Sequence, residues 1–324
     1  MKTISSLNNI SLLTVLILMI SGSVNAIEPV GIKQKQSLNI FIIGNSFSQN
    51  ATTYLNQLTK EAGKTLVLGR AELGGCTLEK HWKLAEAYEL DPNDPKGKPY
   101  NGKSLRMLLS VGTWDIVTIQ QYSLYSSDIE TYRPYAKKLY DYIKQIQPQA
   151  EVVFHQTWAY RNDAKYFSQV TDGQSAKSAM DMWEKSRNAY HIIAKEFNVR
   201  IIPVGDAFQY MCNDPLWRYV KDTKYIFENP QYPDLPDQTH SLNVGYKWDS
   251  NKKLISDFNH ANDAGCFLGS LVWFDFLFRE SPVNLKFKPE KMDENFAKQL
   301  KKAAAITVKK NSKNQIKIKD KVLN

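Results

Sequence analysis

The sequence predicts an α/β fold, a three-layer α/β/α sandwich around a central, mainly parallel five-stranded sheet. Short apolar runs alternate with longer segments of helical spacing, an order that favours parallel strands joined by right-handed crossovers. The first apolar run, residues 38–43, stops at Gly44-Asn45-Ser46, and residues 50–58 then change to helical spacing. We therefore expect Ser46 on a strand-to-helix turn at the carboxyl edge of the sheet, where ligands bind in such folds.

Four more apolar runs give the remaining strands of the sheet, and helical patterns lie between them. The last helical pattern is apolar on most of its faces, so we expect that helix to be buried. Residues 91–103 are rich in Pro, Gly and Lys and predict a surface loop. The predicted strands are 65–70, 116–119, 151–155 and 199–204, and the predicted helices are 78–89, 132–146, 175–197 and 264–278.

Residues 1–26 have the pattern of an export signal. Lys2 supplies the positive start, residues 11–20 the apolar core, and Ala26 ends a small-residue cleavage site. The apolar run is short for a membrane span and no second one follows, so we expect none in the mature chain. Cleavage near Ala26 would leave a periplasmic or secreted protein.

The rest of the chain predicts one domain, residues 27–285, followed by a basic extension, residues 286–324. The extension holds twelve lysines and four acidic residues, a surplus that nearly matches the +9 of the whole chain, so the domain itself is close to neutral. We interpret the extension as a solvated tail and expect no nucleic-acid partner, because no base-stacking motif accompanies the charge. Residues 293–304 suit a helix, and residues 306–308 and 316–318 suit a hairpin.

Asp257 and His260 lie three residues apart, just before the last helix. On a loop entering that helix, the carboxylate can accept one ring N–H, which leaves the other ring nitrogen to take a proton from a hydroxyl. A serine hydroxyl needs such a base, so Ser46, His260 and Asp257 are the candidate catalytic residues. His240 is the only rival base, and helix capping is the alternative role for His260.

These segments resemble the SGNH/GDSL hydrolase superfamily. Gly44-Asn45-Ser46 matches its first block, a Gly-Asp/Asn-Ser turn, and Asp257-Phe258-Asn259-His260 matches its last block, Asp-x-x-His. The resemblance covers roughly residues 38–278 and implies the flavodoxin-like SGNH hydrolase fold. With its third strand ending in Gln120-Gln121, where the superfamily has Gly-x-Asn-Asp, the chain is similar to an SGNH-like branch of gut Bacteroidetes, a domain of unknown function of the DUF4886 type.

The resemblance also implies an oxyanion hole. Its donors would be the Ser46 amide, the amide of Gly74 or Gly75 in the second block, and the side chain of Gln120 or Gln121, which replaces the asparagine of the third block. We expect further residues to contact substrate at the rim of the site, with the pinning of a long loop as the alternative for the aromatic residues and a place on a helix surface as the alternative for His81. These expected substrate contacts are Asn45, His81, Trp158 and Tyr160.

The predicted function is that of an exported serine esterase that removes O-acetyl or other small acyl groups from a polysaccharide or glycan. Aromatic residues in two insertions, 157–161 and 210–253, suit stacking on a sugar ring. A non-catalytic glycan-binding protein on the same fold and a lipase or thioesterase are the alternatives. The histidines form no zinc-binding pair and no nucleotide-binding motif is present, so we expect no metal and no cofactor.

Overall fold

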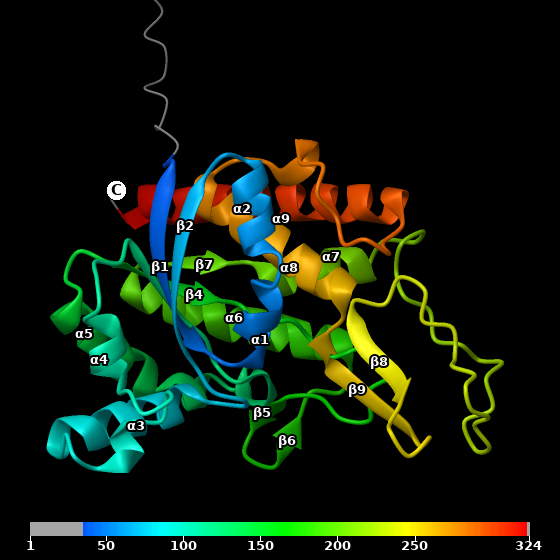
Figure 1. Ribbon diagram of the computed structural model, residues 1–324, viewed down its shortest axis with the longest axis horizontal. Helices are drawn as coiled ribbons and strands as arrows, with labels where there is room; N and C mark the ends of the chain where they lie inside the picture. The colour runs from blue at the N-terminus through cyan, green and yellow to red at the C-terminus, as the bar shows by residue number, and fades with distance from the viewer. Residues whose placement is uncertain (1–34, 323–324) are drawn as a thin grey trace, which may run out of the picture. The chain divides into compact units, whose positions relative to one another are not determined.

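An all-parallel, five-stranded sheet lies at the centre of residues 35–322, which are the residues that this computed structural model describes (Figure 1). The strand order is β2-β1-β3-β4-β7. This arrangement confirms the predicted α/β fold and each of the five predicted strands. The predicted export signal lies outside the described residues. The strands are β1 (Ser37–Gly44), β2 (Thr65–Glu72), β3 (Ile116–Ile119), β4 (Glu151–His155) and β7 (Arg200–Ile202).

Helices cover both faces of the sheet. Neighbouring residues of a strand point to opposite faces, and Ile40 and Phe41 accordingly belong to two separate buried clusters. The Ile40 cluster contains residues of α1 (Ser46–Ala51), α2 (Leu55–Glu61), α7 (Val204–Cys212), α8 (Asp263–Phe278) and α9 (Glu294–Val322). The Phe41 cluster contains residues of α3 (Leu78–Leu90), α4 (Leu105–Leu109), α5 (Tyr135–Ile146) and α6 (Ala179–Phe197).

Helix α8 is buried along almost its whole length, as its apolar sequence predicts. It contacts α1, α2, α7 and α9, so neighbours surround it on several sides. Burying apolar side chains on every face of one helix requires such enclosure. The helix starts at the cap residue Asn262, two residues after His260, so the packing of α8 fixes the end of the segment that carries His260.

Helix α9 corrects two expectations for the C-terminal extension. The chain is helical from Glu294 to Val322, so the hairpin predicted over residues 306–318 is wrong. Leu300, Ala304 and Val308 are buried and recur at helical spacing, and no Gly or Pro follows to stop the helix. The extension is therefore no simple solvated tail, because this face of α9 packs on α8.

The helix predicted over residues 50–58 is divided into α1 and α2. The hydroxyls of Thr52 and Thr53 donate to the carbonyls of Ser48 and Gln49, and the Tyr54 N–H donates to the Ser270 hydroxyl of α8. Side-chain hydrogen bonds of this kind compete with a regular helical ladder. The break leaves α1 as a short helix that begins at Ser46.

Two small antiparallel pairs complete the described part of the chain. The pair β5 (Gln169–Thr171) and β6 (Gln174–Ser175) follows β4, and the pair β8 (Asn243–Trp248) and β9 (Leu254–Ala261) carries Asp257 and His260. No helix within residues 35–322 combines the length and the apolar character needed to cross a bilayer. Short 3-10 helices are η1 (Pro95–Gly97), η2 (Ser123–Tyr125), η3 (Ile129–Tyr132) and η4 (Pro282–Asn284).

Candidate active site

Ser46 and His260 meet in space although 214 positions separate them in the chain. Ser46 Oγ lies 2.9 Å from His260 Nε2, and His260 Nδ1 lies 2.9 Å and 3.1 Å from the two carboxylate oxygens of Asp257. A carboxylate only accepts, so Nδ1 carries the ring proton and Nε2 is left to accept the Ser46 hydroxyl. The structure thus brings together the three residues predicted as catalytic, in the order of a Ser-His-Asp triad.

Asp257 is set up to stay ionised. Partial burial opposes the charged form, but hydrogen bonds from the ring and the backbone N–H of His260 outweigh it, and the pKa of the Asp257 carboxyl is lowered. An ionised carboxylate stabilises the imidazolium that forms when His260 takes a proton.

The backbone of β9 explains how Asp257 and His260 face each other. Along a regular strand, residues three apart point to opposite faces. Here Asn243 pairs with Ala261 and Gly245 pairs with Asp257. A segment of three residues on β8 therefore lies opposite a segment of five residues on β9. The bulge turns both side chains to one side. The predicted loop is therefore wrong, because both residues lie in a bulged strand.

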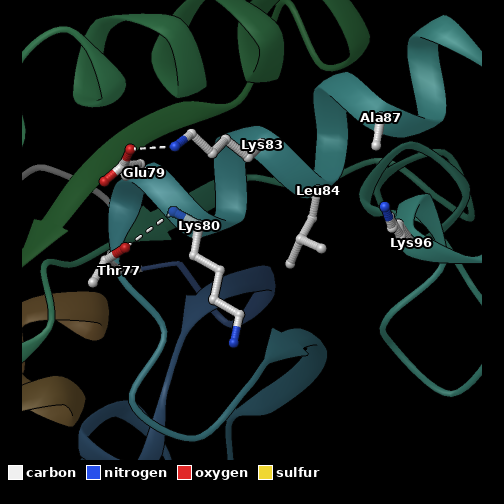
Figure 2. Close-up of a pocket in the computed structure, with 7 residues that line it drawn as sticks. All are labelled: Thr77, Glu79, Lys80, Lys83, Leu84, Ala87 and Lys96. Atoms are coloured by element: carbon white, nitrogen blue, oxygen red, sulfur yellow. Dashed lines mark hydrogen bonds and ion pairs between the residues drawn. The ribbon is translucent and has the colours of Figure 1, made fainter.

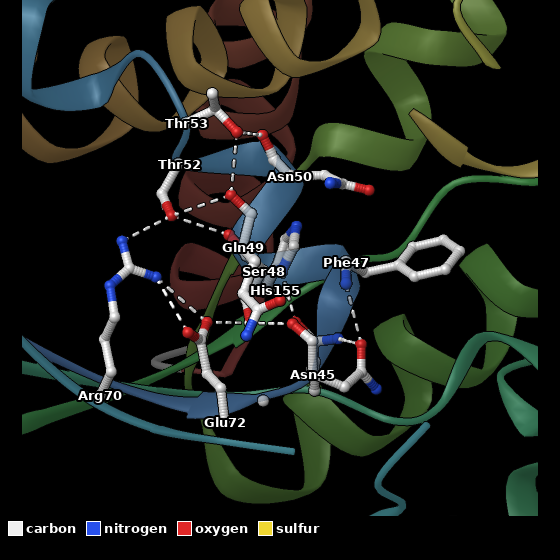
Figure 3. Close-up of polar contacts among 12 residues, drawn as sticks. Asn45, Phe47, Ser48, Gln49, Asn50, Thr52, Thr53, Arg70, Glu72 and His155 are labelled. Atoms are coloured by element: carbon white, nitrogen blue, oxygen red, sulfur yellow. Dashed lines mark hydrogen bonds and ion pairs between the residues drawn. The ribbon is translucent and has the colours of Figure 1, made fainter. Parts of the chain in front are cut away.

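Asn45 fixes the turn that presents Ser46 (Figure 3). Its side-chain oxygen accepts the Phe47 N–H at 3.0 Å and so caps α1, and its side-chain nitrogen donates to the Cys76 carbonyl at 3.0 Å. No part of Asn45 is exposed. Its predicted role as a substrate contact is corrected to that of a positioning residue, which ties the nucleophile turn to the chain after β2.

A buried chain of hydrogen bonds leads from Asn45 into the sheet. Gln120 Nε2 donates to Asn45 Oδ1 at 2.7 Å, and Gln120 Oε1 lies 2.7 Å from His155 Nδ1, which donates to it. Burial lowers the pKa of His155 to about 3, so the ring is neutral. Gln120 is 1% exposed and its amide nitrogen donates to Asn45, which corrects its predicted role in the oxyanion hole.

Gln121 is likewise committed to the protein. Its side-chain nitrogen donates to the carbonyl and the hydroxyl of Thr131, and its oxygen accepts the N–H groups of Leu78 and Tyr122. The residue is 1% exposed. Its predicted role as an oxyanion donor is therefore corrected too, since both amide protons are already donated.

The Gly74-Gly75 turn remains available as a source of oxyanion donors. The Cys76 N–H bonds the Leu73 carbonyl across the turn, and Gly75 has a φ of +60°, which favours glycine. Both glycines are exposed, and neither N–H donates to another described residue. The Leu73 N–H donates to the Gly44 carbonyl at 3.2 Å, which holds the turn beside the nucleophile turn.

The other predicted substrate contacts lie behind the site. His81 has no exposed surface, accepts from the Tyr100 hydroxyl and donates through Nε2 to the Gly44 carbonyl at 3.0 Å. Trp158 is 1% exposed and donates to the Asn259 carbonyl at 2.9 Å, while its ring stacks on Phe47. These residues support the backbone on either side of Ser46 and His260, and their predicted contact with substrate is corrected to this supporting role.

Tyr160 is also buried, and His240 contacts aromatic residues away from Ser46. The Tyr160 hydroxyl lies 3.1 Å from the Ser123 hydroxyl and the residue is 4% exposed, so its predicted contact with substrate is corrected as well. His240 packs against the rings of Trp217 and Phe296. The structure therefore places His260, and not its rival His240, beside the nucleophile.

Arg161 is a supporting residue that the sequence does not single out. Its guanidinium donates to both carboxylate oxygens of Asp163 at 2.6 Å and 2.8 Å, and the backbone N–H of Arg161 donates to the Phe258 carbonyl at 2.9 Å. The charge lies 4.9 Å from the Phe258 ring centre. A side chain at Gly245 would overlap the guanidinium. Arg161 thus anchors the bulged strand next to Asp257.

A tyrosine beside the Gly74-Gly75 turn and an exposed tyrosine that packs on Tyr160 were not predicted. The Tyr122 ring lies beside Gly75, so a methyl group added there would meet it at 3.8 Å. Tyr166 is 67% exposed and its ring contacts that of Tyr160 edge-on. Tyr122 lies three residues after the end of β3, at the carboxyl edge of the sheet, and this position could have identified it.

Helix α1 is also tied to the end of β2. The Ser48 hydroxyl lies 2.5 Å from a carboxylate oxygen of Glu72, and Arg70 contacts both oxygens of Glu72 and the Thr52 hydroxyl (Figure 3). The side chain of Glu72 is 4% exposed. This network fixes the side of α1 that faces away from β9.

Comparisons with known proteins agree with the fold. A family model described as "Domain of unknown function (DUF4886)" matches residues 39–216, which include Ser46 and the Gly74-Gly75 turn. The crystal structure of a DUF4886 family protein from Bacteroides uniformis is similar, with 22% identity, a TM-score of 0.64, and coverage of 84% of this chain and 95% of that one. A search of curated proteins found no match.

Two further solved structures have weaker similarity. A putative GDSL-like lipase from Parabacteroides merdae has 14% identity and a TM-score of 0.41, over 75% of this chain and 97% of that one. A possible lipase from Chitinophaga pinensis has 14% identity and a TM-score of 0.40, over 74% of this chain and 96% of that one.

Proposed function

Because the chain belongs to the DUF4886 family and holds Ser46, His260 and Asp257 in one hydrogen-bonded row, we propose that it is a serine hydrolase of carboxylic esters. The observation that carries this proposal is the 2.9 Å contact between Ser46 Oγ and His260 Nε2, backed by the Asp257 carboxylate. All three residues are partly exposed. This exposure leaves the Ser46 hydroxyl accessible at the carboxyl edge of the sheet, where ligands bind in such folds.

In the proposed reaction, Ser46 Oγ attacks the ester carbonyl carbon while His260 Nε2 takes the hydroxyl proton. The tetrahedral intermediate collapses as His260 gives that proton to the leaving alcohol, and the acyl group stays on Ser46. A water molecule then attacks the acyl carbon and loses a proton to His260. The carboxylic acid leaves when His260 returns that proton to Ser46 Oγ. Asp257 holds the ring in the required tautomer throughout.

The oxyanion of each intermediate is held by backbone N–H groups in this proposal. Ser46 is the first residue of α1, so its N–H has no partner within the helix. The Gly74 and Gly75 N–H groups are also free of partners among the described residues. One well-placed donor typically lowers the barrier by about 3 kcal/mol. Two or three backbone donors replace the glutamine side chains that the sequence suggested.

The proposed substrate is an O-acetyl or other small acyl ester of a polysaccharide or glycan, met in the periplasm or outside the cell. Tyr122 beside the Gly74-Gly75 turn and the exposed Tyr166 provide ring faces on which a sugar can stack. Tyr232 in the second insertion is 55% exposed and packs edge-on against Trp248. Export follows from the predicted signal over residues 1–26.

Acetate release from acetylated plant and host glycans tests the proposed function. We expect the protein to release acetate, to hydrolyse 4-nitrophenyl acetate faster than the octanoate ester, and to lose both activities in Ser46→Ala. Faster cleavage of the octanoate ester would instead indicate a lipase. Binding of a glycan by the unaltered protein without any ester hydrolysis would overturn the esterase proposal in favour of a glycan-binding protein.

A further inference from the structure

A basic groove lies along the start of α3. It has a volume of about 390 Å³ and is lined by residues of α3, by its cap residue and by η1 (Figure 2). Leu84 and Ala87 supply an apolar floor, and three lysines and one glutamate supply the charge. The lining residues are Thr77, Glu79, Lys80, Lys83, Leu84, Ala87 and Lys96.

The charge of the groove is carried by Lys80 and Lys96. Lys83 is neutralised by Glu79 at 2.6 Å, and Figure 2 shows Lys80 extending away from that pair. Neither Lys80 nor Lys96 forms an ion pair with any residue of the described chain. Two unpaired ammonium groups beside an apolar floor form a site for an anionic group on a ring.

The groove adjoins the candidate active site. Thr77 lines it and stands two residues after Gly75, which limits the distance between their Cα atoms to about 7 Å. The Lys80 N–H donates to the Thr77 hydroxyl at 3.0 Å, so Lys80 lies in the first turn of α3, close to the glycine turn. A glycan with its ester at Ser46 can therefore place a neighbouring sugar over the first turns of α3.

We propose that this groove binds a carboxylate or sulfate group of the substrate, so that the enzyme acts on esters of acidic glycans. The proposal rests on the proposed function, because it describes a subsite of the same active site. The rest of residues 27–285 is close to neutral overall, so the protein has no general attraction for anions there, and the selectivity arises locally from Lys80 and Lys96.

Binding to Ser46→Ala protein tests the subsite without turnover. Calorimetry at low salt would use a non-acetylated galacturonate oligosaccharide, a sulfated oligosaccharide and a neutral xylose oligosaccharide as probes. We expect the charged probes to bind and the neutral one to bind more weakly, with the difference largely lost at about 0.5 M salt. The stronger of the two charged probes identifies the anionic group.

The variant Lys80→Met/Lys96→Met is expected to weaken binding of the charged probe by about tenfold. Lys195→Met is the matched control, because Lys195 is an exposed lysine in the last turn of α6, just before β7 begins. Equal binding by the double variant and the control, or equal binding of charged and neutral probes, would overturn the subsite. Hydrolysis of 4-nitrophenyl acetate should be unchanged in the Lys195→Met control. Failure of the unaltered protein to hydrolyse this ester would refute the esterase function alone, because the binding measurements test the subsite without turnover.

Discussion

Two buried histidines should make the protein sensitive to mild acid. His81 and His155 are fully buried, and burial lowers the pKa of His81 to about 4 and that of His155 to about 3. An unfolded histidine has a pKa of about 6.5. Below that value the unfolded chain binds more protons than the folded protein, so the free energy of unfolding falls as the pH falls.

The size of the effect follows from these values. Between pH 7 and pH 5 each unfolded imidazole becomes largely protonated while its folded counterpart stays neutral, which lowers the free energy of unfolding by about 2 kcal/mol per histidine. The two together remove about 4 kcal/mol, a large part of the 5–15 kcal/mol typical of a domain. Carboxyl groups with lowered pKa values, such as Asp257, act mainly below pH 4 and add little in this window. Burial raises the pKa of Asp275 to about 7, so its protonation in the folded protein offsets about 2 kcal/mol of the histidine effect and leaves a net loss of about 2 kcal/mol.

Urea unfolding at pH 7 and pH 5 measures the loss, and His155→Gln isolates one contribution. A glutamine nitrogen can still donate to Gln120, so the variant keeps the hydrogen bond while removing the titrating ring. We expect the loss of unfolding free energy between the two pH values to shrink by about 2 kcal/mol in the variant. An equal loss in both proteins would refute the reasoning.

Three further substitutions test the support of the site. Arg161→Met leaves the buried carboxylate of Asp163 without its cation and should lower the free energy of unfolding, measured with urea, by about 3–5 kcal/mol. Adding Asp163→Asn to that variant should restore part of this loss. Gly75→Ala should keep the fold but lower kcat by about tenfold, because the left-handed turn disfavours a side chain and its N–H would move. Gln120→Glu places a carboxylate oxygen against Asn45 Oδ1 and should lower kcat more than it changes KM; an unchanged kcat would contradict the positioning role.

The sequence predicted the sheet and the meeting of the two distant blocks well. Buried parallel strands appear as short apolar runs, and all five predicted strands agree with the observed ends to within two residues. The Gly44-Asn45-Ser46 turn and the Asp257/His260 pair were found because a serine nucleophile needs a base and an acid, whatever the fold between them.

Side-chain direction was the part that the sequence did not reveal. Asn45, His81 and Trp158 lie near Ser46 or the segments that hold the site, but they point inward and bond backbone carbonyls or caps. Proximity along the chain says nothing about which side of the backbone a residue faces. Buried polar groups need partners, and those partners come from remote segments that only the fold brings near.

The bulged strand and the last helix depended on long-range packing in the same way. The bulge at Asp257 exists because β9 pairs with β8, and Arg161 fixes it from a third segment. The extension became helical along its length because α8 offers a surface for Leu300 and Ala304. Local sequence patterns had favoured a loop for the segment with Asp257 and His260, and a hairpin for part of the C-terminal extension.

Active-site labelling tests the central claim most directly. We expect a fluorophosphonate probe to form one adduct on the folded protein, located by mass spectrometry at Ser46, and the adduct to be lost in His260→Ala and reduced in Asp257→Asn. Circular dichroism would establish that both variants are folded. An unlabelled Ser46 in the folded, unaltered protein, or labelling that persists without His260, would contradict the account.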